Sequence, residues 1–137
     1  MNRSTLLGYQ LLTGFSDVAT GALLAVAPAL ALQMLRLPQT TAIRGVSLAF
    51  IGAFVLPVGL AHLYGALAVY RGNCKRDLEM VWLLTAFIRS SVAIFLFAQV
   101  SVGALATGWL TVAAFDAACA LFQAVGLSKG WSVHAVQ

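Results

Sequence analysis

The stretch Ala86-Phe87-Ile88-Arg89-Ser90-Ser91 places one guanidinium group in the middle of an apolar run that extends from Met80 to Val102. That run is long enough to cross a lipid bilayer as a helix. An arginine at the centre of such a helix costs roughly 2.5 to 3.5 kcal/mol on insertion scales. We therefore expect Arg89 to have partners, and two aspartates in other apolar runs, Asp17 and Asp116, have the required charge.

The composition indicates an integral membrane protein. Hydrophobic residues make up 61% of the chain and charged residues 9%, against roughly 25% charged residues in a soluble domain. The mean hydropathy is +0.94. The 137 residues leave room for four spans of about 20 residues each and no separate soluble domain. We predict one all-α domain over residues 1–137, an integral membrane four-helix bundle.

The interruptions of the apolar runs place these spans. Pro28 breaks the first run, so a short interfacial segment is expected from there to Leu37, because proline ends or redirects a helix. The most hydrophilic loop is Arg71–Asp77, and small residues connect the last two runs. The predicted spans are residues 6–27, 45–70, 78–102 and 109–127.

The basic residues outside the spans predict the orientation. Five of them fall on the side of both termini (Arg3, Arg71, Lys75, Arg76, Lys129) and two on the other side (Arg36, Arg44). By the positive-inside rule both termini are cytoplasmic, as in a multi-pass protein of a bacterial inner membrane. We expect no cleaved signal peptide, because the short N-terminal region leads into a full span. The net charge of +4 reflects topology, and no nucleic-acid partner is expected.

Several classes of function lack their sequence signatures. Cys74 and Cys119 are expected in different environments, which disfavours a disulfide between them. The chain has no paired-His or Cys metal spacing, glycine-rich phosphate loop or Ser-His-Asp order. We expect no metal and no cofactor.

The charged residues inside the spans are expected to lie at the same depth in the membrane. Counted from the cytoplasmic ends of their spans, Asp17, Arg89 and Asp116 each lie about 11 residues deep, or roughly 16 Å, near the midplane. His62 lies about one turn lower. The three charges, all ionised, carry a net charge of −1, so we expect one further proton on an aspartate or on His62. One carboxylate as base and one as acid is an arrangement that acid–base chemistry uses.

The candidate site follows from this layer. We assign Asp17, Arg89, Asp116 and His62 as candidate catalytic residues. Polar or aromatic residues on the same helix faces are candidates for contacting substrate: Gln10, Thr13, Thr20, Gln123, Trp82 and Thr85. Because Gln10 and Gln123 lie nearer the cytoplasmic end, we expect a cavity that opens on that side.

Structural interpretations compete with each of these assignments. A buried Asp–Arg cluster can have the purely structural role of fixing which helices pack together. His62 can be an interior histidine whose hydrogen bonds are satisfied. Gly45, Gly52 and Gly59 recur every seven residues, a small-residue seam that allows close helix approach and would permit a homodimer.

Several short features occur along the chain: Pro28, Leu35-Arg36-Leu37-Pro38, Arg44-Gly45, Ile51-Gly52-Ala53-Phe54 and Gly59-Leu60. In these features the chain resembles the DoxX-like group of small four-helix bacterial membrane proteins. In chemistry alone, the Asp-Arg-Asp set is similar to the centre of limonene-type epoxide hydrolases, which implies that one acid activates water and the other protonates the leaving oxygen.

Two classes of function follow from the sequence. The first is a membrane enzyme acting on a lipophilic small molecule, most concretely by hydrolysis of an epoxide or by epoxide-opening cyclisation. The second is a non-catalytic bundle that binds a lipid or serves as a partner subunit, in which the Asp/Arg cluster is structural. A proton-coupled transporter is a weaker third option, because four spans would have to dimerise to form a usual pathway.

Overall fold

A computed structural model describes residues 2–34, 45–72 and 75–131. It contains five helices, α1 (Arg3–Val26), α2 (Pro28–Met34), α3 (Gly45–Arg71), α4 (Lys75–Ser101) and α5 (Trp109–Ser128). The described part of the chain has no strand, so the all-helical prediction is confirmed. The predicted spans match the four long helices to within about three residues at each end, and α1 ends just before Pro28 as expected.

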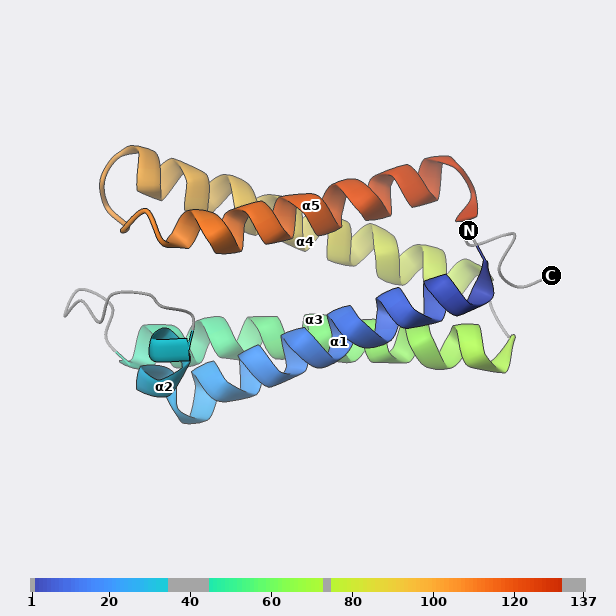
Figure 1. The fold of residues 1–137 in the computed structure, drawn as a ribbon, viewed down its shortest axis with the longest axis horizontal. Coiled ribbons are helices and arrows are strands. Elements are labelled where there is room, and N and C mark those ends of the chain that lie inside the picture. Colours follow the sequence, from blue (N-terminus) through green and yellow to red (C-terminus); the bar gives the residue numbers. More distant parts are fainter. Residues whose placement is uncertain (1, 35–44, 73–74, 132–137) are drawn as a thin grey trace.

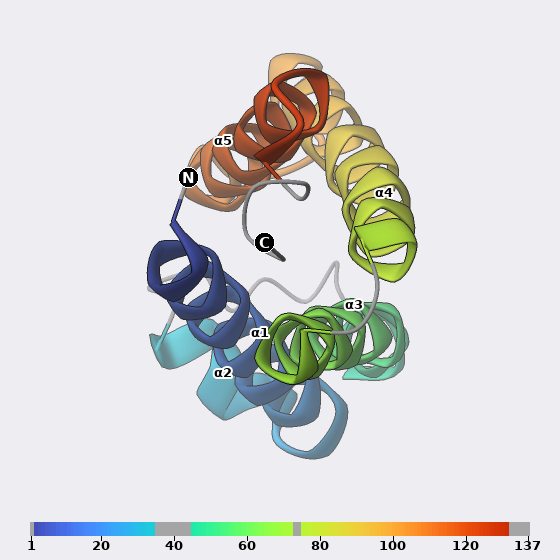
Figure 2. The ribbon, with the colours of Figure 1, turned by 90° about the vertical axis from the view of Figure 1, so that its right-hand side faces the viewer.

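The four long helices run side by side in two pairs (Figures 1 and 2). Helix α1 packs along α3 and α5 packs along α4, while contact between the two pairs is much sparser. The start of α1 and the end of α5 lie at one end of the molecule, here called the terminal end. Toward the opposite, distal end, the pair α1/α3 and the pair α4/α5 move apart (Figure 1).

Glycines allow the close approach of α1 to α3. A Cβ atom added at Gly59 would lie 2.5 Å from the backbone nitrogen of Val18, and one at Gly52 would lie 2.6 Å from the carbonyl oxygen of Gly21. Both glycines are therefore covered within the chain. The predicted homodimer stays a prediction, although Gly52 and Gly59 of the seam pack against α1 of the same chain; nothing is described of the surroundings of Gly45.

The pairing of α1 with α3 is also fixed at the terminal end. The Nε atom of Arg3 donates to the carbonyl of Val69 at 3.2 Å, and its Nη2 atom donates to the carbonyl of Tyr70 at 2.6 Å. The last carbonyls of a helix have no partner within the helix, so Arg3 supplies hydrogen bonds to two of them; the Val69 carbonyl also accepts from the backbone nitrogen of Gly72 at 3.3 Å. The side chain of Asn2 caps the start of α1 by accepting from the backbone nitrogen of Thr5.

Three helices are long and apolar enough to cross a membrane, over Leu48–Arg71, Arg76–Ser101 and Trp109–Ser128. Large apolar side chains are exposed on the outer surfaces of all four long helices, as suits contact with lipid. Helix α1 has 24 residues but is not among the three. Its stripe of Gln10, Thr13, Asp17 and Thr20 lowers its hydropathy.

Two apolar clusters occupy the ends of the interior. Leu6, Val69, Leu78 and Trp82 belong to the cluster at the terminal end. Leu24, Leu32, Leu48, Leu96 and Trp109 belong to the cluster at the distal end. The polar and charged interior residues lie between these clusters, which places them at mid-depth.

Candidate functional site

Arg89 binds two aspartates that come from two other helices. Its Nη1 atom donates to Oδ1 of Asp116 on α5 at 2.5 Å, and its Nη2 atom donates to Oδ2 of Asp17 on α1. Arg89 is 4% exposed. The three residues that depth counting placed at one level are thus in direct contact, and this ion triad links the pair α1/α3 to the pair α4/α5.

Each aspartate binds Arg89 through only one of its two carboxylate oxygens. Among the described residues, no further hydrogen bond reaches Oδ1 of Asp17 or Oδ2 of Asp116. Neither oxygen is among the fully enclosed polar atoms that lack a partner. The two side chains retain 9% and 14% exposure. The second oxygen of each carboxylate is therefore accessible to a small molecule.

A cavity of about 490 Å³ lies directly against the triad, and Asp17, Arg89 and Asp116 all line it. From the triad it extends toward the distal end between the two helix pairs. Its other polar lining residues are Ser16, Thr20 and Thr111. The remaining lining is aliphatic and aromatic, and includes Phe50, Phe54, Val58, Val92, Phe95, Trp109 and Phe115. This volume lies within the range of small-molecule pockets, and a mostly apolar wall with a few convergent polar groups is their usual composition.

A second polar layer lies on the terminal side of the triad. His62 on α3 shares a 2.5 Å hydrogen bond between its Nδ1 atom and Oε1 of Gln10. Gln123 on α5 reaches the His62 Nε2 atom at 3.3 Å and donates to the hydroxyl of Thr85 at 2.9 Å. Gln10, His62 and Gln123 are 0% exposed. This layer is enclosed on all sides.

Aromatic rings fill the space around this second layer. Tyr9 packs edge-on against His62, with ring centroids 6.0 Å apart, and against Trp82 at 5.8 Å. Phe122 lies 4.5 Å from Tyr9 and 6.0 Å from Trp82. The half of the interior nearest the termini is consequently packed.

The six residues predicted to contact substrate are divided between the cavity and the packed terminal side of the triad. Thr20 lines the cavity. The other five lie on the terminal side: Gln10, Gln123 and Thr85 in the second layer, Trp82 in the aromatic cluster, and Thr13 bonded to the carbonyl of Tyr9. Of the four candidate catalytic residues, His62 also lies in the second layer and does not line the cavity.

The expected cavity on the side of the termini is wrong. The sequence places glutamine and histidine there, and polar residues suggest water. In the structure these side chains bind one another and the rings of Tyr9, Trp82 and Phe122 close the space. The cavity forms on the distal side, where the helix pairs diverge.

Sequence reasoning missed several lining residues. Ser16 and Thr111 each contribute one hydroxyl group to a helix face that has no consistent polar pattern. The sequence therefore did not single them out. Phe50 and Phe54 are a clearer signal, because residues four apart on a helix share one face. Their rings pack at 4.8 Å between centroids, and both line the cavity.

Within the described part of the chain, no group of three or more His, Cys, Asp or Glu side chains could hold a metal ion. Comparison of the chain with protein-family models, with curated proteins and with solved structures found no match. The resemblances to DoxX-like proteins and to epoxide hydrolase chemistry therefore stay predictions, and the functional argument depends on the geometry of this site.

Proposed function

We propose that the chain is a membrane-embedded four-helix bundle whose Asp17-Arg89-Asp116 centre opens the epoxide ring of a lipophilic small molecule. Helix α1 is the fourth span in this proposal, shielded by α3 along its glycine-rich face. Both termini lie on the cytoplasmic side, because Arg3, Arg71, Arg76 and Lys129 occupy the terminal end of the helices.

The observation that supports this proposal is the contact of one apolar cavity with both carboxylates. An ion triad that only fixed helix positions would require no cavity at its side. Here each carboxylate keeps one oxygen that Arg89 does not bind. A substrate oxygen and a water molecule can therefore reach two acid–base groups at once, as general acid–base catalysis requires.

The chemistry uses one proton that the two carboxyl groups share. The ionised aspartate takes a proton from water, and the water oxygen forms a bond to one ring carbon of the epoxide. The ring C–O bond breaks, and the neutral aspartic acid gives its proton to the oxygen that leaves the carbon. The product is a vicinal diol, and an internal hydroxyl in place of water gives a cyclic ether. Asp17 and Asp116 can take either role.

Arg89 and the hydroxyl groups have supporting roles. Arg89 holds both carboxylates in place and stabilises the ionised one. Its Cζ atom lies 5.6 Å from the ring centroid of Phe115, a cation–π contact that fixes the guanidinium. Ser16, Thr20 and Thr111 line the same cavity and offer hydrogen bonds to water. In this proposal these hydroxyls take the place of Gln10 and Gln123 as polar contacts, and His62 takes no part in catalysis.

Turnover of lipophilic epoxides by purified protein tests the proposal. Wild-type protein is expected to convert at least one member of a broad panel to diol, and Asp116→Asn to lose that activity. Asp77→Asn is the matched control, since this aspartate accepts from Tyr64 at 3.0 Å near the start of α4, away from the cavity. Equal background turnover by wild type and Asp116→Asn across the panel would refute epoxide chemistry.

One observation favours a non-catalytic alternative, a bundle that binds lipid or serves as a partner subunit. Arg89 on α4 forms an ion pair with Asp17 on α1 and so connects the two helix pairs, which make few contacts with each other. If connection is its whole role, the triple variant Asp17→Leu/Arg89→Leu/Asp116→Leu should assemble better than Arg89→Leu alone, because Arg89→Leu leaves two buried carboxylates without their cation. Full cellular function in that triple variant would favour the alternative.

A further inference from the structure

The cavity ends at the triad. Its lining stops at Ser16 and Asp17 on α1, Val58 on α3, Ile88 and Arg89 on α4, and Asp116 on α5. The next interior residues toward the terminal end are packed, with Thr85 2% exposed and His62 0%. A ligand in the cavity therefore cannot extend past the two carboxylates.

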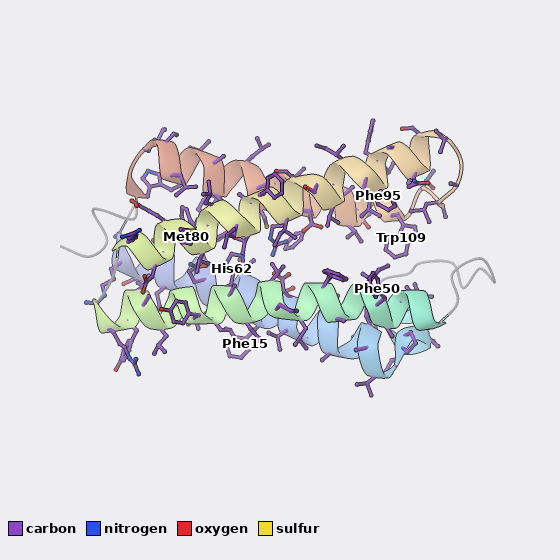
Figure 3. The ribbon with its side chains drawn as sticks, turned by 180° about the vertical axis from the view of Figure 1, so that it is seen from behind. Phe15, Phe50, His62, Met80, Phe95 and Trp109 are labelled. Atoms are coloured by element: carbon purple, nitrogen blue, oxygen red, sulfur yellow. The ribbon has the colours of Figure 1, made fainter. Side chains whose placement is uncertain are left out.

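At the distal end, aromatic lining residues of α3 and α4 are exposed. Phe50 and Phe54 on α3 line it and are 65% and 61% exposed, and Phe95 on α4 lines it and is 57% exposed. Figure 3 places Phe50 and Phe95 on these two helices at the end of the molecule where they lie farther apart. In a bilayer these rings meet lipid chains, so hydrocarbon can pass from the membrane into the cavity.

The polar groups are distributed unequally over the walls. On the α3 and α4 walls, every lining residue except Arg89 is apolar. Ser16 and Thr20 lie on α1, and Thr111 lies on α5. Hydrocarbon is thus favoured along α3 and α4, and water along α1 and α5.

From this arrangement we infer that the cavity takes a hydrocarbon chain end-on from the bilayer, through the opening between α3 and α4, and acts on an epoxide at the leading end of that chain. This inference rests on the proposed function and adds the class and position of its substrate. An epoxide in the middle of a long chain would need one half of the chain to lie beyond the triad, where the second layer and the aromatic rings fill the space.

The reaction at the chain end balances without any co-reactant except water. One C–O bond of the terminal oxirane breaks and one C–O bond to water forms. The water proton goes to the ionised carboxylate, and the proton of the neutral carboxyl goes to the oxirane oxygen. The product is a 1,2-diol whose two hydroxyls lie beside the triad.

Positional isomers of one epoxide test the end-on geometry. Wild-type protein in lipid nanodiscs is incubated with 1,2-epoxyhexadecane and with 7,8-epoxyhexadecane. We expect kcat/KM for the terminal isomer to exceed that for the internal isomer by about 100-fold, because misplacement of the reacting atoms by even 1 Å can cost that factor. Equal kcat/KM values would overturn the end-on inference and leave epoxide opening intact. Turnover of neither isomer, nor of any other epoxide, would overturn both.

The entry route is tested with a bulky residue at the opening. Ile51 on α3 lines the cavity beside Phe50, whereas Ile94 on α4 is exposed and lies outside the lining. Ile51→Trp is expected to lower kcat/KM for the terminal epoxide at least tenfold, and the matched control Ile94→Trp to leave it unchanged. Ile51→Phe provides a smaller obstruction, should the tryptophan variant fail to fold. Equal kinetics for the Ile51 and Ile94 variants would overturn entry between α3 and α4.

Discussion

At the residue scale, the site depends on a single arginine shared by two carboxylates. The position of Arg89 in an apolar run and the equal depth of Asp17 and Asp116 predicted this contact from sequence. The prediction succeeded because helical rise is constant, so residue counts convert to depth. The hydrogen-bond partners of His62 were beyond such counting, because they depend on side-chain rotamers and on which polar groups satisfy each other.

Removal of Arg89 tests its electrostatic role. Arg89→Met leaves two carboxylates close together without their cation. We expect a loss of about 3 to 5 kcal/mol in the free energy of unfolding, as when one member of a buried charge pair is removed. The measurement is denaturant unfolding in detergent micelles. Arg71→Met, at an exposed arginine at the end of α3, is the control, and an equally small loss in both variants would contradict the role.

The second layer allows a separate test at the same scale. Gln10→Leu removes the partner of the His62 Nδ1 atom, and an unsatisfied buried polar group costs about 1 to 3 kcal/mol. We expect lower stability but an unchanged KM for an epoxide substrate, because this layer does not line the cavity. A large rise in KM with unchanged stability would show that Gln10 contacts substrate after all.

At the element scale, the helix boundaries were largely predictable and the helix faces were not. Pro28 and the polar segment 71–77 mark the ends of apolar runs, so span positions follow from local sequence. Local sequence does not show which helix packs against a glycine face, because a small residue permits close approach without specifying the helix that approaches. Gly52 and Gly59 face α1 of the same chain, although their spacing fits a second copy equally well.

The glycine contacts predict a clear difference between two substitutions of the same type. Gly59→Ala places a methyl group 2.5 Å from the Val18 nitrogen, so α1 and α3 must separate, at a cost of about 1 to 3 kcal/mol. At Gly8 an added Cβ has no neighbour within 4 Å, so Gly8→Ala is expected to be neutral or stabilising by up to about 1 kcal/mol. Thermal unfolding in detergent compares them, and equal melting temperatures would contradict the close packing of α1 on α3.

At the scale of the whole molecule, the sequence predicted the number of long helices but placed the cavity at the wrong end. Gln10 and Gln123 in the terminal half suggested a cavity that opens at that end. The divergence of the two helix pairs reverses this arrangement (Figure 1). Such divergence depends on the sum of many packing contacts between α1/α3 and α4/α5, which no single stretch of sequence encodes.

The membrane topology is testable at this scale. Both ends of the helical domain are expected on the cytoplasmic face, and the connection between α4 and α5, residues 102–108, on the opposite face. Single cysteines at Asn2, Ala104 and Lys129, in a variant with Cys74 and Cys119 replaced by serine, can be labelled with a membrane-impermeant maleimide. Labelling of Asn2→Cys and Lys129→Cys from opposite sides of the membrane would contradict an arrangement with an even number of spans.

The most direct test of the central claim is a single turnover in H₂¹⁸O, with the protein in excess over a lipophilic terminal epoxide. Our account predicts a diol that carries one ¹⁸O atom in the first turnover, because a carboxylate activates water and does not attack the ring itself. Asp17→Asn and Asp116→Asn should each form no diol above background. Diol formation at the same rate in these variants, or a first-turnover diol without ¹⁸O, would contradict the account.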